Sequence, residues 1–164
     1  KYYRYINLNK VYQGPKITNK NNIQRIAMMK ALIIDDKKRI SESLKALIAG
    51  SGYFSNVSTA SNGIDACKMI QDDKYDLIVI DLNLPEMSGQ QVLRYIERLY
   101  HLESRSSSSY PHIMLISGDL DEAKIDEASK IQVEEVLTKP FNAREFNDKL
   151  YTILENLNGE IIAA

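Results

Sequence analysis

The chain has 164 residues, of which 44% are hydrophobic and 26% charged, proportions typical of a soluble globular protein with one well-developed core. No apolar run approaches the roughly 20 residues needed to cross a bilayer, and no signal-peptide pattern opens the sequence, so we expect no membrane anchor. Cys67 is the single cysteine, which excludes an internal disulfide and fits a reducing, cytoplasmic location.

Charge divides the chain into two unequal parts. Residues 1–30 contain seven of the 21 Lys and Arg and no acidic residue, whereas residues 31–164 contain all 22 Asp and Glu. Residues 1–28 also lack a sustained helical or strand period. We therefore expect residues 1–28 to be a basic extension outside the domain, residues 29–158 to form the domain, and residues 159–164 to be a short tail. The alternative for residues 1–28 is an arm that binds nucleic acid or anionic lipid, and it rests on charge and tyrosines alone.

From residue 29 onward, strand and helix patterns alternate five times. Short runs of branched apolar residues predict buried strands, and apolar residues at helical spacing predict the helices between them. The predicted strands cover 31–34, 57–60, 75–80, 112–116 and 136–138. The predicted helices lie around 40–48, 63–70, 92–100, 121–131 and 146–157, and Gly50 and Gly52 are expected to end the first of them. This alternation predicts an α/β fold in which one parallel sheet is doubly wound, with helices on both faces.

Polar side chains follow four of the five predicted strands. Asp35 and Asp36 follow the first strand, Asp81 the third, Ser117 the fourth and Lys139 the fifth. The carboxyl ends of parallel strands meet at one edge of such a sheet, and ligands bind at that edge. We therefore expect these side chains to lie close together.

The segment around Asp81 is the most informative part of this set. Four apolar residues, Leu77–Ile80, precede Asp81, which we expect at the strand's end because burying an unpaired charge is costly. Pro85 removes a backbone donor and Gly89 tolerates unusual dihedrals, so a turn leading into a helix is predicted after Asp81.

Three carboxylates, a hydroxyl and an ammonium at one edge indicate phosphoryl chemistry. Three neighbouring carboxylates repel one another, and Mg²⁺, which prefers oxygen ligands, would offset that repulsion. Lys139 and Ser117 could each contact a phosphoryl oxygen. A carboxylate beside a metal and a lysine can attack phosphorus and form an aspartyl-phosphate.

Through the residues that follow its strands, the chain from about Met29 to Leu157 resembles the receiver domain of bacterial two-component response regulators. This family includes the chemotaxis regulators and has a flavodoxin-like fold. The matching features are Asp35-Asp36, the run from Asp81 to Gly89, Ser117 and Lys139-Pro140. The resemblance implies a five-stranded sheet in the order 2-1-3-4-5. It also implies a cis bond between Lys139 and Pro140.

The resemblance further implies a role for each residue of the edge. Asp81 would accept a phosphoryl group from a histidine kinase or a histidine phosphotransfer protein, with self-catalysed phosphorylation and dephosphorylation as its only activity. Mg²⁺ would be bound by Asp36, Asp81 and the backbone carbonyl of Asn83, with Asp35 acting through water. Lys139 would contact the phosphoryl group and Ser117 would move towards it. The output would be an altered contact with a downstream protein, and we expect no DNA-binding domain and no membrane partner.

Two features depart from the family pattern. Val136 occupies the position, three residues before the strand-five lysine, where the family usually has Tyr or Phe. The loop from Leu102 to Pro111 is longer than usual, which surface loops tolerate at little entropic cost. Val136 supplies no charge or ligand, so the missing aromatic should not affect phosphorylation. It concerns how a change at the site would reach the surface that contacts a downstream protein.

Three other functions remain as alternatives at this point. A phosphorylation-independent interaction module is compatible with Val136, whereas the intact Asp36, Asp81 and Lys139 argue against it. A flavin-binding domain would need an anion cradle after the first strand, where this chain has Asp35 and Asp36. A phosphatase with an aspartyl-phosphate intermediate would resemble a pattern with a second acid two residues after the nucleophile, where this chain has Asn83.

Overall fold

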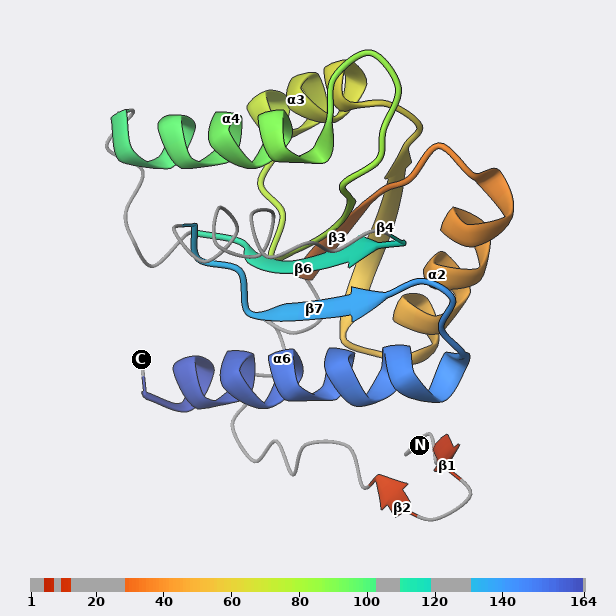
Figure 1. Cartoon of the computed structure of the whole chain (residues 1–164). Helices are drawn as coiled ribbons and strands as arrows, with labels where there is room; N and C mark the ends of the chain where they lie inside the picture. The colour runs from red at the N-terminus through yellow and green to blue at the C-terminus, as the bar shows by residue number, and fades with distance from the viewer. Residues whose placement is uncertain (1–4, 8–9, 13–28, 103–109, 119–130, 164) are drawn as a thin grey trace.

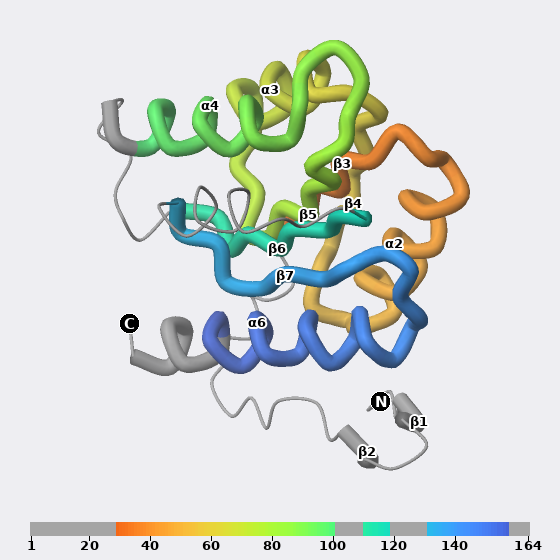
Figure 2. Tube along the Cα trace, viewed as in Figure 1, coloured from red at the N-terminus to blue at the C-terminus, as the bar shows by residue number. Residues whose placement is uncertain are grey.

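The five strands of the central sheet are all parallel in the computed structural model, which describes residues 5–7, 10–12, 29–102, 110–118 and 131–163. They are β3 (Met29–Ile34), β4 (Phe54–Ala60), β5 (Leu77–Asp81), β6 (His112–Ser117) and β7 (Glu135–Thr138). Their spatial order is β4-β3-β5-β6-β7, so β5 lies between β3 and β6 (Figure 2). Counted along the chain within this sheet, the order is 2-1-3-4-5, and the predicted α/β fold is confirmed.

Four described helices cover the two faces of the sheet. They are α2 (Lys38–Gly50), α3 (Gly63–Asp72), α4 (Gly89–Leu102) and α6 (Ala143–Ala163). Helices α3 and α4 lie on one face, and α2 and α6 lie on the other (Figure 1). No helix among the described residues is long and apolar enough to span a membrane.

Alternation along the strands separates the core into two apolar clusters. In β3, Ala31 and Ile33 pack in the cluster beneath α2 and α6, whereas Leu32 and Ile34 pack in the cluster beneath α3 and α4. All five residues of β5 are buried. Burial on both faces explains why these strands appear in the sequence as continuous apolar runs rather than as alternating patterns.

Several element boundaries differ from the sequence prediction. Helix α2 includes Gly50, and the left-handed residue that follows it is Gly52, with φ of +78°. Strand β4 begins at Phe54, three residues earlier than predicted, and Tyr75 precedes β5 rather than belonging to it. Helix α6 continues to Ala163, so residues 159–163 extend the last helix instead of forming a separate tail.

Two predicted segments fall largely outside the described residues. The helix predicted around 121–131 is described only at Ile131, which is buried. Of the long loop after α4, the structure describes Leu102 at its start and Tyr110 and Pro111 at its end. Within the N-terminal extension, where no strand period was found, Tyr5–Asn7 (β1) and Lys10–Tyr12 (β2) pair as antiparallel strands.

A contact between buried His112 and the more exposed Glu134 joins the amino ends of β6 and β7, at the edge of the sheet opposite Asp81. The Nδ1 atom of His112 contacts Glu134 Oε1, and Asn156 Nδ2 of α6 donates to Glu134 Oε2 at 3.3 Å. Burial opposes ionisation of Glu134, but its contact with His112 and the hydrogen bond from Asn156 together lower the pKa of this carboxyl below its usual range. The ionised carboxylate therefore stabilises the folded chain.

We expect Glu134→Gln to lower stability at neutral pH by less than about 1 kcal/mol, because Glu134 is partly exposed and solvent screens its contacts. Because folding lowers the pKa of Glu134, the contribution is complete above the unfolded-state pKa of about 4.3 and is lost as the pH falls through the folded-state value. Urea unfolding at a series of pH values measures it, with Glu155→Gln at an exposed position of α6 as the control. A stability difference that stays constant down to acidic pH would rule out this linkage.

Candidate functional site

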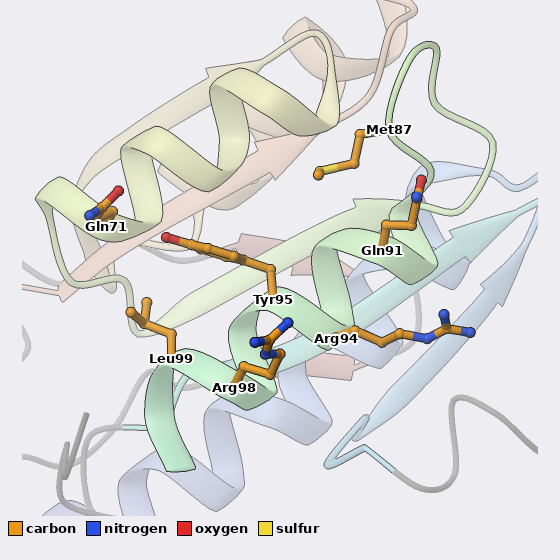
Figure 3. A pocket seen from close by; sticks show the side chains of 7 residues that line it. All are labelled: Gln71, Met87, Gln91, Arg94, Tyr95, Arg98 and Leu99. Carbon is orange, nitrogen blue, oxygen red and sulfur yellow. The ribbon is translucent and has the colours of Figure 1, made fainter. Parts of the chain in front are cut away.

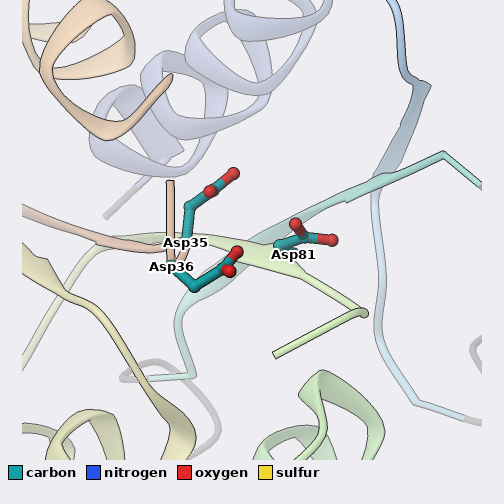
Figure 4. A group of neighbouring side chains, drawn as sticks. All are labelled: Asp35, Asp36 and Asp81. Carbon is teal, nitrogen blue, oxygen red and sulfur yellow. The ribbon is translucent and has the colours of Figure 1, made fainter. Parts of the chain in front are cut away.

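The side chains predicted to converge meet at the carboxyl edge of the sheet. Asp35 and Asp36 follow β3, Asp81 is the last residue of β5, Ser117 is the last residue of β6, and Lys139 follows β7. In Figure 4 the carboxylates of Asp35, Asp36 and Asp81 gather at this edge. The parallel order of β3, β5, β6 and β7 brings residues more than 100 positions apart into one site.

The three carboxylates differ in exposure. Asp35 and Asp81 are each only 2% exposed, whereas Asp36 is exposed to solvent. One carboxylate oxygen from each lies within 4.8 Å of the others. Backbone amides hold two of them in place, because Lys37 N–H donates to Asp35 Oδ1 at 2.8 Å and Asn83 N–H donates to Asp81 Oδ1 at 3.0 Å.

Lys139 links the two buried carboxylates. Its Nζ donates to Asp35 Oδ2 at 2.8 Å and to Asp81 Oδ2 at 2.5 Å. Burial alone would lower the pKa of the Lys139 ammonium, but the hydrogen bonds and charges of Asp35 and Asp81 outweigh it and raise the pKa above its usual value. Lys139 therefore stays charged at neutral pH and offsets part of the carboxylate repulsion.

Ser117 and Val136 lie on the neighbouring strands. Ser117 is fully buried, and its carbonyl accepts a hydrogen bond from Lys139 N–H at 2.7 Å. The peptide bond between Lys139 and Pro140 is cis, as the family resemblance predicted. Val136 pairs with Leu115 and packs, half-buried, against the apolar cluster on the α3 and α4 face.

Close packing around Gly89 holds the loop that follows Asp81 in place. Gly89 N–H donates to the Leu82 carbonyl at 3.1 Å, which closes the loop onto the start of α4. A Cβ atom at Gly89 would lie 2.3 Å from the Asp81 carbonyl oxygen and 2.8 Å from the Leu82 Cα. The turn predicted from Gly89 therefore depends on its small size, and it directly supports the backbone of Asp81.

We expect Gly89→Ala to lower the free energy of unfolding by about 1–3 kcal/mol, because the new methyl group must displace the Asp81 backbone. Urea unfolding measures the loss. Gly118→Ala is the matched control, since a Cβ there would meet only the Lys139 Cβ, at an ordinary 3.8 Å. Equal stabilities of the two variants would contradict the role of the close approach.

The donor atoms of this site fit a hard divalent cation. The group contains three carboxylates with nearby oxygens and no sulfur or imidazole ligand, which is the chemistry that Mg²⁺ prefers. The exposed Asp36 leaves a route to solvent on one side, and Mg²⁺ characteristically retains several waters. The site can therefore combine a cation, a nucleophilic carboxylate and a fixed ammonium.

The response regulator receiver domain family matches residues 31–151. The chain belongs to this family. Receiver domains are the phosphoacceptors of two-component signalling, so the phosphorylation-independent reading is not favoured. The flavin-binding and phosphatase alternatives have no support in this family match.

Individual relatives agree with the family assignment. Chemotaxis protein CheY of Pseudomonas aeruginosa is 31% identical over 134 residues, which cover 80% of this chain and 100% of the relative. Alkaline phosphatase synthesis transcriptional regulatory protein PhoP of Bacillus subtilis is 32% identical over 125 residues, which cover 76% of this chain but 48% of the relative. The CheX-CheY-BeF3-Mg complex of Borrelia burgdorferi has a TM-score of 0.64 at 18% identity, covering 77% of this chain and 89% of that chain, and supports the fold alone.

The sequence did not identify the backbone amides of Lys37 and Asn83 as partners of the acidic site. No sequence signal could have found them, because every non-proline residue offers the same amide. A second missed feature is a row of long polar side chains on α4, among them Arg94 and Arg98. Their i, i+4 spacing was available in the sequence as a signal.

Proposed function

We propose that Asp81 of this receiver domain is the residue that accepts the phosphoryl group. The supporting observation is the position of its carboxylate at the end of β5, where Oδ2 receives the Lys139 ammonium and two further carboxylates lie close by. Asp35 is buried and bound by both Lys37 and Lys139, so it suits a supporting role better than that of nucleophile.

In the proposed transfer, a carboxylate oxygen of Asp81 attacks the phosphorus of a phosphohistidine on the donor protein. The oxygen–phosphorus bond forms as the nitrogen–phosphorus bond breaks, and the electron pair leaves with the imidazole, which takes up a proton. Lys139 stabilises the negative charge on the phosphoryl oxygens, and the Ser117 hydroxyl can donate to one of them. The protein positions groups and neutralises charge.

We propose that Asp36, Asp81 and the backbone carbonyl of Asn83 hold Mg²⁺, with Asp35 acting through water. The cation would neutralise charge on the transferring phosphoryl group. The oxygen-only donor set supports this assignment. The Borrelia burgdorferi regulator solved with BeF3 and Mg has the same fold and gives the assignment a structural precedent.

The metal-dependence experiment tests this proposal directly. In the presence of Mg²⁺, acetyl phosphate is expected to add one phosphoryl group to the chain, measured by intact mass. Excess EDTA is expected to reduce the rate by about 100-fold or more, since charge neutralisation of this kind contributes several kcal/mol. Phosphorylation that proceeds unchanged in EDTA would eliminate the metal role of Asp36.

The proposed donor is a histidine kinase or a histidine phosphotransfer protein, and the proposed receiver of the signal is a downstream protein. We further propose that the chain acts as a phosphoryl-group acceptor with self-catalysed turnover, not as an enzyme on a separate substrate. The family match and the chemotaxis and transcriptional regulators among the relatives support this class of partner.

We propose a domain that starts at residue 29 and includes the whole of α6. The start coincides with the first residue of β3 and with the change in charge after residue 30. The family match at residues 31–151 lies within these bounds. Residues 1–28 are then an extension that phosphorylation does not require.

A further inference from the structure

A groove of about 610 Å³ lies between α3 and α4. Most of its lining comes from α4, with Gln71 contributed by α3 and Met87 by the loop after Asp81 (Figure 3). The α4 residues that line it are Gln91, Arg94, Tyr95, Arg98 and Leu99.

The lining combines a few apolar side chains with a row of positive charge. Tyr95 and Leu99 are one helical turn apart, and Arg94 and Arg98 form a parallel row at the same i, i+4 spacing. Both arginine side chains are exposed, whereas Leu99 is buried and Tyr95 half-buried. The described lining contains no acidic residue.

The groove is physically connected to the phosphorylation site through Met87. The Met87 Sδ lies 3.6 Å from the Cys67 Sγ of α3. A Cβ at Gly63 would lie 2.5 Å from the Met87 carbonyl oxygen, so α3 and the loop are in close contact. The same loop begins at Asp81 and is closed by Gly89, whose N–H binds the Leu82 carbonyl.

We propose that this groove is a docking surface for an acidic amphipathic helix of a partner protein. Charge complementarity supports this occupant, because two exposed arginines lie beside the apolar side chains of the groove. Arginine forks bind carboxylates in a bidentate manner. Tyr95 and Met87, which are both half-buried, would receive the apolar side of the incoming helix. The segment of α4 that lines the groove, from Gln91 to Leu99, is roughly 12 Å long, which matches about two turns of helix.

A second copy of this chain is a poorer occupant. The apolar stripes of α2 and α6 that the structure describes are already buried against the sheet, and those of α3 and α4 are buried on the opposite face. None of these helices offers both acidic residues and a free apolar stripe. The inference goes beyond the proposed function, because binding in the groove does not require phosphorylation of Asp81.

The test is selection from a display library of helical peptides about 11 residues long, or three turns, against the whole chain. Leucine is fixed on one face, and Glu, Gln, Lys and Ser vary elsewhere. We expect the enriched peptides to be acidic and to shift the backbone amide NMR signals of residues 91–99. The double variant R94E/R98E is expected to weaken their binding at least about tenfold.

Two controls separate groove binding from general charge effects and from misfolding. K45E/R144E makes the same change in net charge at exposed positions on α2 and α6, and binding to it is expected to stay within about twofold. R94Q/R98Q removes the charges without reversing them and should weaken binding in the same direction. An Asp81→Asn chain should bind the peptides unchanged, which keeps this test independent of the proposed phosphorylation.

Three results would overturn the proposal. The first is enrichment of neutral or basic peptides, or no enrichment at all. The second is equal binding to the native chain and to R94E/R98E. The third is self-association of the native chain that R94E/R98E abolishes in sedimentation experiments, which would assign the groove to a second copy.

Discussion

Asp81→Asn is expected to abolish phosphorylation by acetyl phosphate, with incorporation at least about 100-fold below that of the native chain. An amide oxygen is a far weaker nucleophile than a carboxylate, and it cannot form a stable acyl phosphate at this position. The hydrogen bond from Asn83 N–H and the position at the end of β5 would remain available to the new side chain. Chemistry rather than folding would therefore account for the loss.

Intact-mass spectrometry after incubation with Mg²⁺ and acetyl phosphate measures this effect. Asp148→Asn is the matched control, since Asp148 is exposed on α6 and pairs only loosely with Arg144, at 3.9 Å. The control is expected to be phosphorylated at the native rate. A phosphorylated Asp81→Asn chain would show that another side chain accepts the group.

Lys139→Met is expected to lower the free energy of unfolding by about 3 kcal/mol in EDTA. Lys139 is the cation shared by Asp35 and Asp81, and removing one partner of a buried ion pair leaves uncompensated charge. Saturating Mg²⁺ should recover part of this loss, because a bound cation would offset the same repulsion. The recovery should be larger in the variant than in the native chain.

Urea unfolding in EDTA and in Mg²⁺ measures both parts of this prediction. Lys149→Met is the control, because Lys149 binds Glu135 at 2.6 Å from a more exposed position and its loss should cost less than about 1 kcal/mol. A Lys139→Met chain that is as stable as the native chain in EDTA would contradict the bridging role.

The site could be located from the sequence because its residues follow buried strands. Each apolar run identified a strand, and parallel topology then required the residues after those strands to share one edge. Parallel topology alone therefore predicted that Asp35, Asp81, Ser117 and Lys139 lie together. It could not show that one ammonium binds both buried carboxylates, since that depends on side-chain reach and on the depth of each strand end.

The ends of the helices and strands were harder to predict than the helices and strands themselves. Gly50 and Gly52 both suggested a helix end, and only backbone geometry shows that Gly52 takes the left-handed conformation while Gly50 remains helical. Glycine at position 89 predicted a turn, but its contact with the Asp81 carbonyl appears only in three dimensions. The groove beside α4 was missed because its pattern, two arginines one turn apart, is also that of an ordinary solvated helix face.

Val136 concerns the signal passed to a downstream protein rather than phosphorylation itself. It packs half-buried in the cluster beneath α3 and α4 and offers no charge or ligand to the acidic edge. Its branched side chain is stiff about χ1, so it cannot replace a rotating aromatic ring. The loop that follows Asp81 contacts α3 on the same face of the sheet, through Met87.

Chemical mapping of the phosphorylated residue tests the central claim most directly. Borohydride reduction of the acyl phosphate converts the modified aspartate to homoserine, and peptide mass spectrometry then locates it in the chain. We predict homoserine at position 81 and unmodified aspartate at positions 35 and 36. Homoserine at position 35 or 36, with Asp81 intact, would contradict the assignment of the phosphoacceptor.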